Sequence, residues 1–218
     1  TDIVNIINSF NSKIMFIPYP NNPTGNCFSE SHVEMIIKKF NGLVVLDEAY
    51  VEFSEDKSFL PRIEKYKNLV ITQTFSKAQG MAGIRLGMTF ANEEIIEMLN
   101  KIRAPYNINS LTQRTALLKL KNQEEVKKEA KIILREKDRL IGHLKEFNFI
   151  QKVFPSDANF ILIRVDNSSK RYNQLIKMNI VVRNTSNQFG CENTLRITVG
   201  LKSENDKLIN ALKKINEL

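Results

Sequence analysis

The chain has 218 residues, of which 42% are hydrophobic and 26% are charged, and its formal net charge is +8. This length accommodates one large domain or two small ones, and the apolar content suffices for a hydrophobic core. The composition therefore excludes a disordered chain, and no apolar run is long enough to span a bilayer.

The basic charge does not select one class of partner. The lysines are spread along several expected helices, so we interpret them as solvated faces and expect neither a nucleic acid nor a membrane as partner. A basic nucleic-acid-binding domain stays an alternative that only the net charge supports. Cys27 and Cys191 lack a paired motif, and His32 and His143 lack metal-ligand spacing, which favours a reduced, cytoplasmic chain without a metal. The chain begins with Thr1 and shows no signal-peptide layout, so we expect a processed or truncated product.

Strands and helices alternate in the first half of the sequence. The apolar patterns and caps predict strands over 13–19, 43–46, 69–71 and 88–91, with helices from Ser29 to about Gly42 and from Asn92 to about Arg103. A polar loop over 54–67 precedes the third strand. This alternation predicts a mainly parallel sheet with helical crossovers.

The second half has a different pattern, and residues 104–107 separate the two. We therefore expect domains over 1–104 and 105–218, the second a small α/β domain. Its predicted elements are helices over 110–120, 123–147 and 169–178, strands over 159–165, 180–183 and 194–199, and a last helix capped by Ser203 with Asp206.

A lysine stands among phosphate-binding residue types directly after the third strand. Lys77 follows hydroxyl residues that include Thr74 and Ser76, and Arg85 lies a few residues further on. Open α/β sheets place ligands at the carboxyl ends of their strands, and a desolvated lysine there can attack a carbonyl. Hydroxyls and backbone N–H groups suit a phosphate. The stretch suggests pyridoxal phosphate held as a Schiff base, with an exposed loop lysine as the alternative.

Polar residues also follow the first two strands. Asp47 comes after four apolar residues, where a carboxylate is costly without a cationic partner such as a pyridinium nitrogen. Tyr50 and Asn22 could donate to the ring oxygen of such a cofactor. A helix cap or lysine partner for Asp47, a core position for Tyr50 and a plain turn for Asn22 remain open.

Two arginines in the second half suggest an anion site. Arg196 lies within an apolar β run, and a buried arginine needs an anion, best a carboxylate. The alternative is an exposed position on one face of an edge strand. Arg183 ends the preceding apolar run and is a second candidate anion contact.

Five motifs together resemble the fold-type I pyridoxal-phosphate aminotransferases, and more narrowly the histidinol-phosphate aminotransferase group. They occur in family order along essentially the whole chain: Asn21–Gly25, Asp47–Tyr50, Thr74–Lys77, Gly83–Gly87 and Leu195–Gly200. The resemblance implies a large domain with a mainly parallel sheet, here truncated, and a small C-terminal α/β domain. It also implies pyridoxal 5'-phosphate as cofactor and a cytoplasmic homodimer.

The resemblance implies a role for each matching residue. Lys77 would bind the cofactor covalently and then shuttle a proton between the substrate's α carbon and the cofactor. The implied cofactor contacts are Asp47 at the pyridine nitrogen, Asn22 and Tyr50 at the ring oxygen, and Thr74, Ser76 and Arg85 at the phosphate. Arg196 would bind the substrate's carboxylate or phosphate, with Arg183 and Asn22 as further substrate contacts.

The implied reaction is transamination of histidinol phosphate with 2-oxoglutarate, in histidine biosynthesis. A threonine-phosphate decarboxylase or another aminotransferase of the same fold is the alternative. Family members carry a substantial portion before the strand that leads to the Asn21–Gly25 turn. This sequence does not contain that portion, which includes an aromatic residue that stacks on the cofactor. We therefore expect that portion on a separate chain or in a longer protein, or else a non-catalytic fragment.

Overall fold

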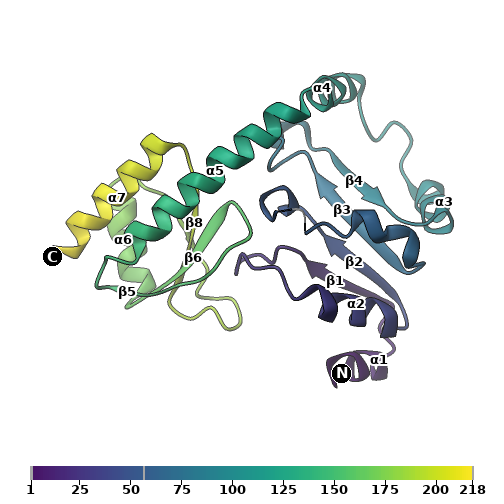
Figure 1. The fold of residues 1–218 in the computed structure, drawn as a ribbon, viewed down its shortest axis with the longest axis horizontal. Helices are drawn as coiled ribbons and strands as arrows, with labels where there is room; N and C mark the ends of the chain where they lie inside the picture. The colour runs from purple at the N-terminus through teal and green to yellow at the C-terminus, as the bar shows by residue number, and fades with distance from the viewer. Residues whose placement is uncertain (1, 56, 218) are drawn as a thin grey trace. The chain divides into compact units, whose positions relative to one another are not determined.

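The computed structural model describes residues 2–55 and 57–217 (Figure 1). They form two compact units: residues up to Asn21 with Cys27–Lys127, and Asn22–Asn26 with the residues from Lys128 onward. Residues 105–127 thus group with the first unit, and the expected domain boundary at residue 104 stays a prediction. Asp56, in the expected 54–67 loop, lies outside the described residues.

The first unit is built around a four-stranded sheet. Its elements in chain order are α1 (Asp2–Ser9), β1 (Ile14–Pro18), α2 (Glu30–Lys39), β2 (Leu43–Asp47), the 3-10 turns η1 (Val51–Phe53) and η2 (Leu60–Lys65), β3 (Leu69–Thr74), η3 (Ala82–Ile84), β4 (Gly87–Phe90), α3 (Glu93–Ile102), α4 (Ser110–Leu120) and the start of α5 (Gln123–Leu144). The strand order is β1-β2-β3-β4, with β1, β2 and β3 parallel and β4 antiparallel to β3. The predicted mainly parallel sheet is confirmed.

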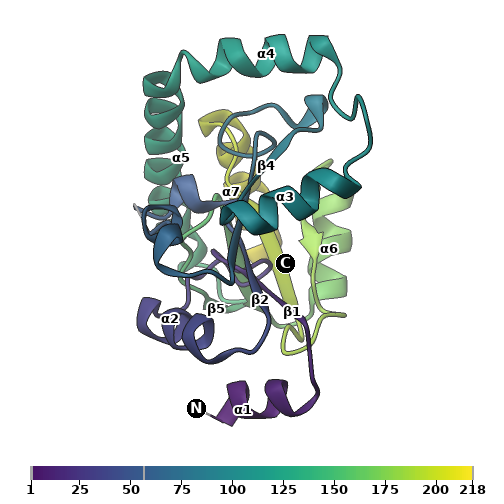
Figure 2. The same cartoon turned by 90° about the vertical axis from the view of Figure 1, so that its right-hand side faces the viewer.

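The core of the first unit lies between this sheet and α2 (Figure 2). Val33 and Ile37 of α2 pack with Val44 and Leu46 of β2, and all four are buried. Val45, which faces the other side of β2, is buried too, as is usual for a parallel strand. The burial explains the continuous apolar run that marks β2 in the sequence.

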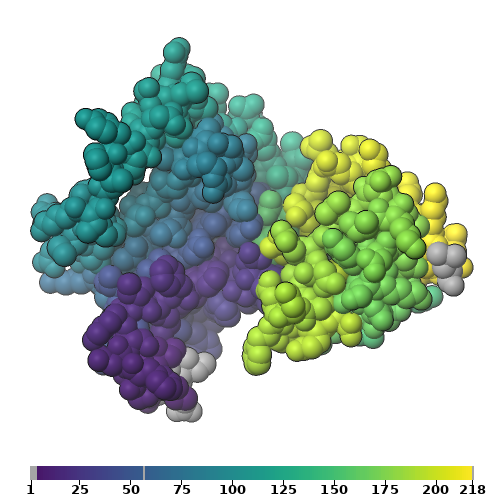
Figure 3. All heavy atoms as spheres, turned by 180° about the vertical axis from the view of Figure 1, so that it is seen from behind, coloured from purple at the N-terminus to yellow at the C-terminus, as the bar shows by residue number. Residues whose placement is uncertain are grey.

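Exposed apolar residues lie at the edge of this sheet that β1 forms. β1 is an edge strand among the described residues. Phe16 of β1 is 70% exposed, and Phe10, just after α1, is 76% exposed. Figure 3 shows the atoms of α1 and β1, in dark purple, on the surface of the first unit.

The second unit holds an antiparallel sheet covered by helices. Its elements are the rest of α5, β5 (Ile150–Val153), β6 (Phe160–Val165), α6 (Ser168–Lys177), β7 (Arg183–Asn184), β8 (Thr194–Thr198) and α7 (Lys202–Asn216). The strand order is β5-β6-β8-β7. Leu144 of α5, Leu175 of α6 and Leu212 of α7 pack with Ile163 and Ile197 in the core. One face of the sheet is therefore apolar and covered, and the other carries the polar side chains of β8.

Several element boundaries differ from the sequence prediction. α7 begins at Lys202, before the predicted cap at Ser203 and Asp206, so that cap is wrong. The Glu204 carboxylate instead accepts from Leu201 N at 2.7 Å, and Asp206 pairs with Arg139. α5 ends at Leu144 rather than Phe147, and the strand predicted over 180–183 is reduced to β7. α1 and β5 were not predicted. The Asn92 cap of α3 is confirmed by its bond from Ile95 N.

Candidate active site

The carboxyl ends of the parallel strands β1, β2 and β3 lie side by side, and Asp47 is at the middle one. Pro18 of β1 pairs with Asp47 of β2, and Asp47 pairs with Thr72 of β3. Asp47 is exposed, and its Oδ1 accepts a hydrogen bond from Ala49 N at 3.1 Å. This bond turns the chain after β2 and leaves the second carboxylate oxygen available to a ligand.

Lys77 and Tyr50 come from two different strand ends and meet in the first unit. Tyr50 immediately precedes η1, and Lys77 follows β3 by three residues. The Lys77 Nζ atom lies 5.1 Å from the centroid of the Tyr50 ring, which is within cation–π range. Lys77 is exposed, so its amine is accessible to a carbonyl compound.

The loop after β3 supplies hydroxyl and guanidinium groups. Thr74 Oγ1 accepts a hydrogen bond from Ser76 N at 3.1 Å, which tightens the turn that leads to Lys77. Arg85 adopts a left-handed backbone conformation, with a φ of 53°, and its Nη1 donates to Ala82 O at 3.0 Å. Arg85 is otherwise exposed, and its remaining donors can bind an anion.

A buried carboxylate that the sequence analysis did not single out supports this edge of the sheet. The sequence predicts a costly, buried carboxylate at Asp47, but Asp47 is exposed and Glu48 is fully buried. Glu48 accepts hydrogen bonds from Ser58 Oγ, Phe59 N and Gln73 Nε2, at 2.7, 2.7 and 2.9 Å. Burial raises the pKa of the Glu48 carboxyl, and these three bonds oppose the rise. Because neighbouring residues along a strand point in opposite directions, Asp47 is exposed and Glu48 is buried. The apolar run before them does not reveal which of the two acids is the buried one.

The second unit joins the Asn22 turn to the arginine of β8. Arg196 Nη1 donates to Asn22 Oδ1. The Arg196 Cζ atom lies 4.9 Å from the centroid of the Phe160 ring. The Nε atom of Arg196 is buried and has no hydrogen-bond partner among the described residues. The guanidinium is thus held on two sides while part of its donor set stays unused.

Arg183 shares a face of the sheet with Arg196. The two residues are direct partners in the β7–β8 ladder, and both line a hollow of about 520 Å³ together with Tyr172 and Thr198. β8 lies between β6 and β7, so the alternative of an edge-strand position for Arg196 is wrong. Like charges directly opposite each other destabilise a sheet, which makes this pair a strong attractor for an anion.

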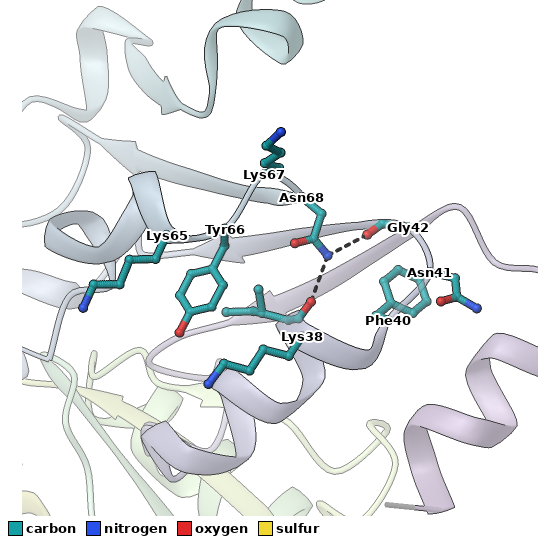
Figure 4. Close-up of a pocket in the computed structure, with 9 residues that line it drawn as sticks. Lys38, Phe40, Asn41, Gly42, Lys65, Tyr66, Lys67 and Asn68 are labelled. Atoms are coloured by element: carbon teal, nitrogen blue, oxygen red, sulfur yellow. Dashed lines mark hydrogen bonds between the residues drawn. The ribbon is translucent and has the colours of Figure 1, made fainter.

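The first unit has a separate hollow, at the end of its strands opposite to Asp47. Figure 4 shows Asn68, which donates from Nδ2 to Gly42 O at 3.1 Å and to Ile37 O at 2.9 Å. Gly42 precedes β2 and Asn68 precedes β3, so this hollow is at the amino ends of the strands. Ligands of open α/β sheets bind at the carboxyl ends, and we therefore interpret these bonds as structural.

The described residues contain no group of three or more histidine, cysteine or acidic side chains that could hold a metal ion. Among the same residues, no helix is both long and apolar enough to cross a membrane.

Comparison with known proteins identifies the family. Residues 2–212 match the family described as aminotransferase class I and II. The chain belongs to this family. It is 52% identical over 206 residues to a histidinol-phosphate aminotransferase of Flavobacterium johnsoniae. That match covers 94% of this chain and 59% of the relative, so the chain spans about 59% of the length of this relative.

Solved structures share the fold of this chain. The histidinol-phosphate aminotransferase of Clostridium acetobutylicum is 30% identical with a TM-score of 0.91, over 97% of this chain and 66% of that one. The L-threonine-O-3-phosphate decarboxylase of Porphyromonas gingivalis is 26% identical with a TM-score of 0.84, over 95% of this chain and 66% of that one. The fold-type I architecture predicted from the sequence is confirmed.

Proposed function

We propose that this chain carries the catalytic residues of a pyridoxal 5'-phosphate-dependent aminotransferase that acts on histidinol phosphate and 2-oxoglutarate, in histidine biosynthesis. The observation that carries the proposal is the meeting of Lys77 with Tyr50 at the carboxyl edge of the sheet, 5.1 Å from Nζ to the ring centroid. The family match supports it.

The residues of this edge fit the cofactor. Lys77 supplies an accessible amine for covalent attachment, and the exposed Asp47 carboxylate would pair with the protonated ring nitrogen. Tyr50 would hydrogen-bond the ring oxygen. Thr74, Ser76 and Arg85 would hold the phosphate with two hydroxyls and one guanidinium. When bound, pyridoxal phosphate carries an amino group between two substrates and withdraws electrons from the substrate's α carbon.

Lys77 would act twice. Its Nζ atom would first hold the cofactor covalently. Once the amino substrate has displaced Lys77 from the cofactor, the freed Lys77 amine would accept the proton from the substrate's α carbon and pass it on. The hydrogen bond from Ser76 N to Thr74 Oγ1 tightens the turn that positions Lys77 at the end of β3.

Arg196 and Arg183 would bind the anionic end of the substrate. Arg196 offers a guanidinium that Phe160 supports from one side and Asn22 fixes from another. A carboxylate or phosphate between the two arginines would relieve their repulsion and engage the unused donors. Both 2-oxoglutarate and histidinol phosphate carry such a group.

The comparisons favour amino transfer from histidinol phosphate over the decarboxylase alternative. The relative from F. johnsoniae at 52% identity is named for the first activity, and the decarboxylase of P. gingivalis is 26% identical. The proposal also includes a cytoplasmic location and a homodimer, as the sequence resemblance implies.

The first test is covalent attachment at Lys77. The purified chain is incubated with pyridoxal phosphate, reduced with borohydride, and mapped by peptide mass. We expect an adduct on Lys77 that Lys77→Ala abolishes and that Lys67→Ala, which removes another exposed lysine, retains. The absence of an adduct at Lys77 would contradict the cofactor assignment for the isolated chain.

The second test is a chimera. The part of the F. johnsoniae relative that matches this chain is replaced by the corresponding residues of this chain. We expect transfer from histidinol phosphate to 2-oxoglutarate that depends on Lys77. Release of carbon dioxide from L-threonine O-3-phosphate instead would support the decarboxylase alternative, and loss of both activities would support a non-catalytic chain.

A further inference from the structure

A buried lysine in the second unit has no role in the chemistry described above. Lys137 of α5 is 6% exposed. Its Nζ atom donates to Ser156 O at 2.7 Å and to Ala158 O at 3.1 Å. Lysine is among the residues least often buried, and its burial requires hydrogen-bond partners for the ammonium group. Lys137 therefore ties α5 to the loop of residues 156–158.

The same loop determines the position of Phe160. Ser156 Oγ donates to Phe160 O at 2.5 Å and accepts from Ala158 N at 3.1 Å. Phe160 begins β6, and its ring lies under the Arg196 guanidinium. One support of Arg196 thus depends on the loop that Lys137 holds.

The loop also determines the position of the Asn22 turn. Asp157 N donates to Gly25 O at 2.7 Å. A Cβ atom at Gly25 would lie 2.6 Å from Ser156 Oγ, so the turn and the loop are in direct contact and only glycine fits. Asn22, three residues earlier in this turn, accepts the hydrogen bond from Arg196. The second support of Arg196 depends on the same loop.

We propose that Lys137 is a positioning residue for the substrate-anion site. Through residues 156–158 it fixes both Phe160 and the Asn22 turn, and these two contacts orient the Arg196 guanidinium. This inference rests on the proposed anion-binding role of Arg196. It extends that role to a helix whose lysine does not touch the substrate.

The direct test measures the order of the Arg196 side chain. In the chain labelled with ¹⁵N-arginine, the Arg196 Nε–H signal is assigned with Arg196→Lys, and its hydrogen exchange is measured. We expect Lys137→Met to accelerate this exchange roughly tenfold, since residues linked through one hydrogen-bond network couple by about this factor. Lys137→Arg keeps a donor and is expected to restore part of the protection.

The control is Lys131→Met, which removes the same charge from an exposed position on the same helix. It is expected to leave the exchange of Arg196 unchanged. Should Lys137→Met fail to fold, Ser156→Ala breaks the same loop by removing the bond to Phe160 O, and the same acceleration is expected. Unchanged exchange in the folded Lys137→Met or Ser156→Ala variant would overturn the proposal.

Affinity for L-histidinol phosphate separates this proposal from the proposed function. If Lys137 acts through Arg196, Lys137→Met weakens binding in the wild-type background and has no further effect in an Arg196→Ala background. Equal losses in both backgrounds would overturn the inference. If Arg196→Ala leaves the affinity unchanged, the anion role of Arg196 is wrong, whereas the exchange experiment still decides whether Lys137 orients it.

Discussion

The ammonium nitrogen of Lys77 lies 5.1 Å from the centroid of the Tyr50 ring. The two residues follow β3 and β2, which are parallel neighbours in the sheet. The contact gives Tyr50 two separable parts: a ring that contacts the lysine and a hydroxyl that would face the cofactor.

Substitution at Tyr50 is expected to separate these parts. Tyr50→Phe keeps the ring but should weaken pyridoxal phosphate binding by about 0.5–1.5 kcal/mol, because one hydrogen bond is lost. Tyr50→Leu should additionally lower the free energy of unfolding by at least about 0.5–1 kcal/mol through loss of the cation–π contact. Equilibrium dialysis and denaturant unfolding check the two values. Equal cofactor affinity in wild type and Tyr50→Phe would exclude the hydroxyl contact.

Arg183→Gln is expected to have opposite effects on stability and binding. Without an anion, the variant should be more stable by about 0.2–1 kcal/mol, because a like-charge cross-strand pair is removed. Its affinity for L-histidinol phosphate should fall. Thermal unfolding with and without the ligand measures both effects. Lys177→Gln, at an exposed position on α6, serves as the charge-matched control. A loss of stability in ligand-free Arg183→Gln would show that repulsion between the arginines is unimportant.

Gly25→Ala is expected to destabilise the chain by roughly 1–3 kcal/mol, because Gly25 has a φ of +83° and the added Cβ atom would lie 2.6 Å from Ser156 Oγ. Gly83→Ala is the matched control, since no atom lies within 4 Å of its Cβ position. Denaturant unfolding of the two variants gives the comparison. Similar stabilities would mean that the turn tolerates a side chain and moves away from residue 156.

The carboxyl of Glu52 is expected to make stability depend on pH. Burial raises the pKa of Glu52 from 4.5 to about 7, and the neighbouring Glu48 carboxyl adds to this rise. Between about pH 4.5 and 7, the Glu52 carboxyl is therefore mostly protonated in the folded chain and mostly ionised in the unfolded chain. Unfolding free energy should fall as pH rises through this window, by at most about 1.4 kcal/mol for each pH unit.

Glu52→Gln stays neutral at every pH and should reduce this slope, whereas Glu64→Gln, at an exposed position, should leave it unchanged. Denaturant unfolding at pH 5, 6 and 7 measures the slopes. Some slope should remain in Glu52→Gln, because burial also raises the pKa of Glu48. Identical slopes in Glu52→Gln and wild type would rule out Glu52 as the responsible group.

The elements that sequence patterns predicted well are those whose signal is local. Four apolar residues mark β2, and the Asn92 side chain caps α3 as its position indicates. The predicted start of α7 is wrong because Ser203 and Asp206 match the sequence pattern of a helix cap. The hydrogen bond from Leu201 N to the Glu204 carboxylate instead forms at the start of the helix. A cap of this kind depends on which residue first becomes helical, and composition alone does not determine it.

The site was predictable in its residue types and less so in its supports. Lys77 and Arg196 stand out because the first is a cation shortly after an apolar strand and the second is a cation within one. The sequence pattern does not indicate that Glu48 and Lys137 are buried. The burial of Glu48 depends on strand alternation, and that of Lys137 depends on contacts with residues 156–158. Roles for the predicted site residues stay predictions until the cofactor and substrate experiments are done.

The second compact unit is discontinuous in sequence, and this affects the order in which it can form. During synthesis, residues 22–26 leave the ribosome more than a hundred residues before Ser156 and Arg196. Bringing Asp157 onto Gly25 closes a loop of roughly 130 residues, at an entropic cost on the order of 4 kcal/mol. The helices α5, α6 and α7 can form locally as soon as they are synthesised. The Asn22 turn can make its contacts only after the residues around 156 and 196 have been synthesised. We therefore expect Arg196 to acquire its final orientation late in folding, after the secondary structure around it is complete.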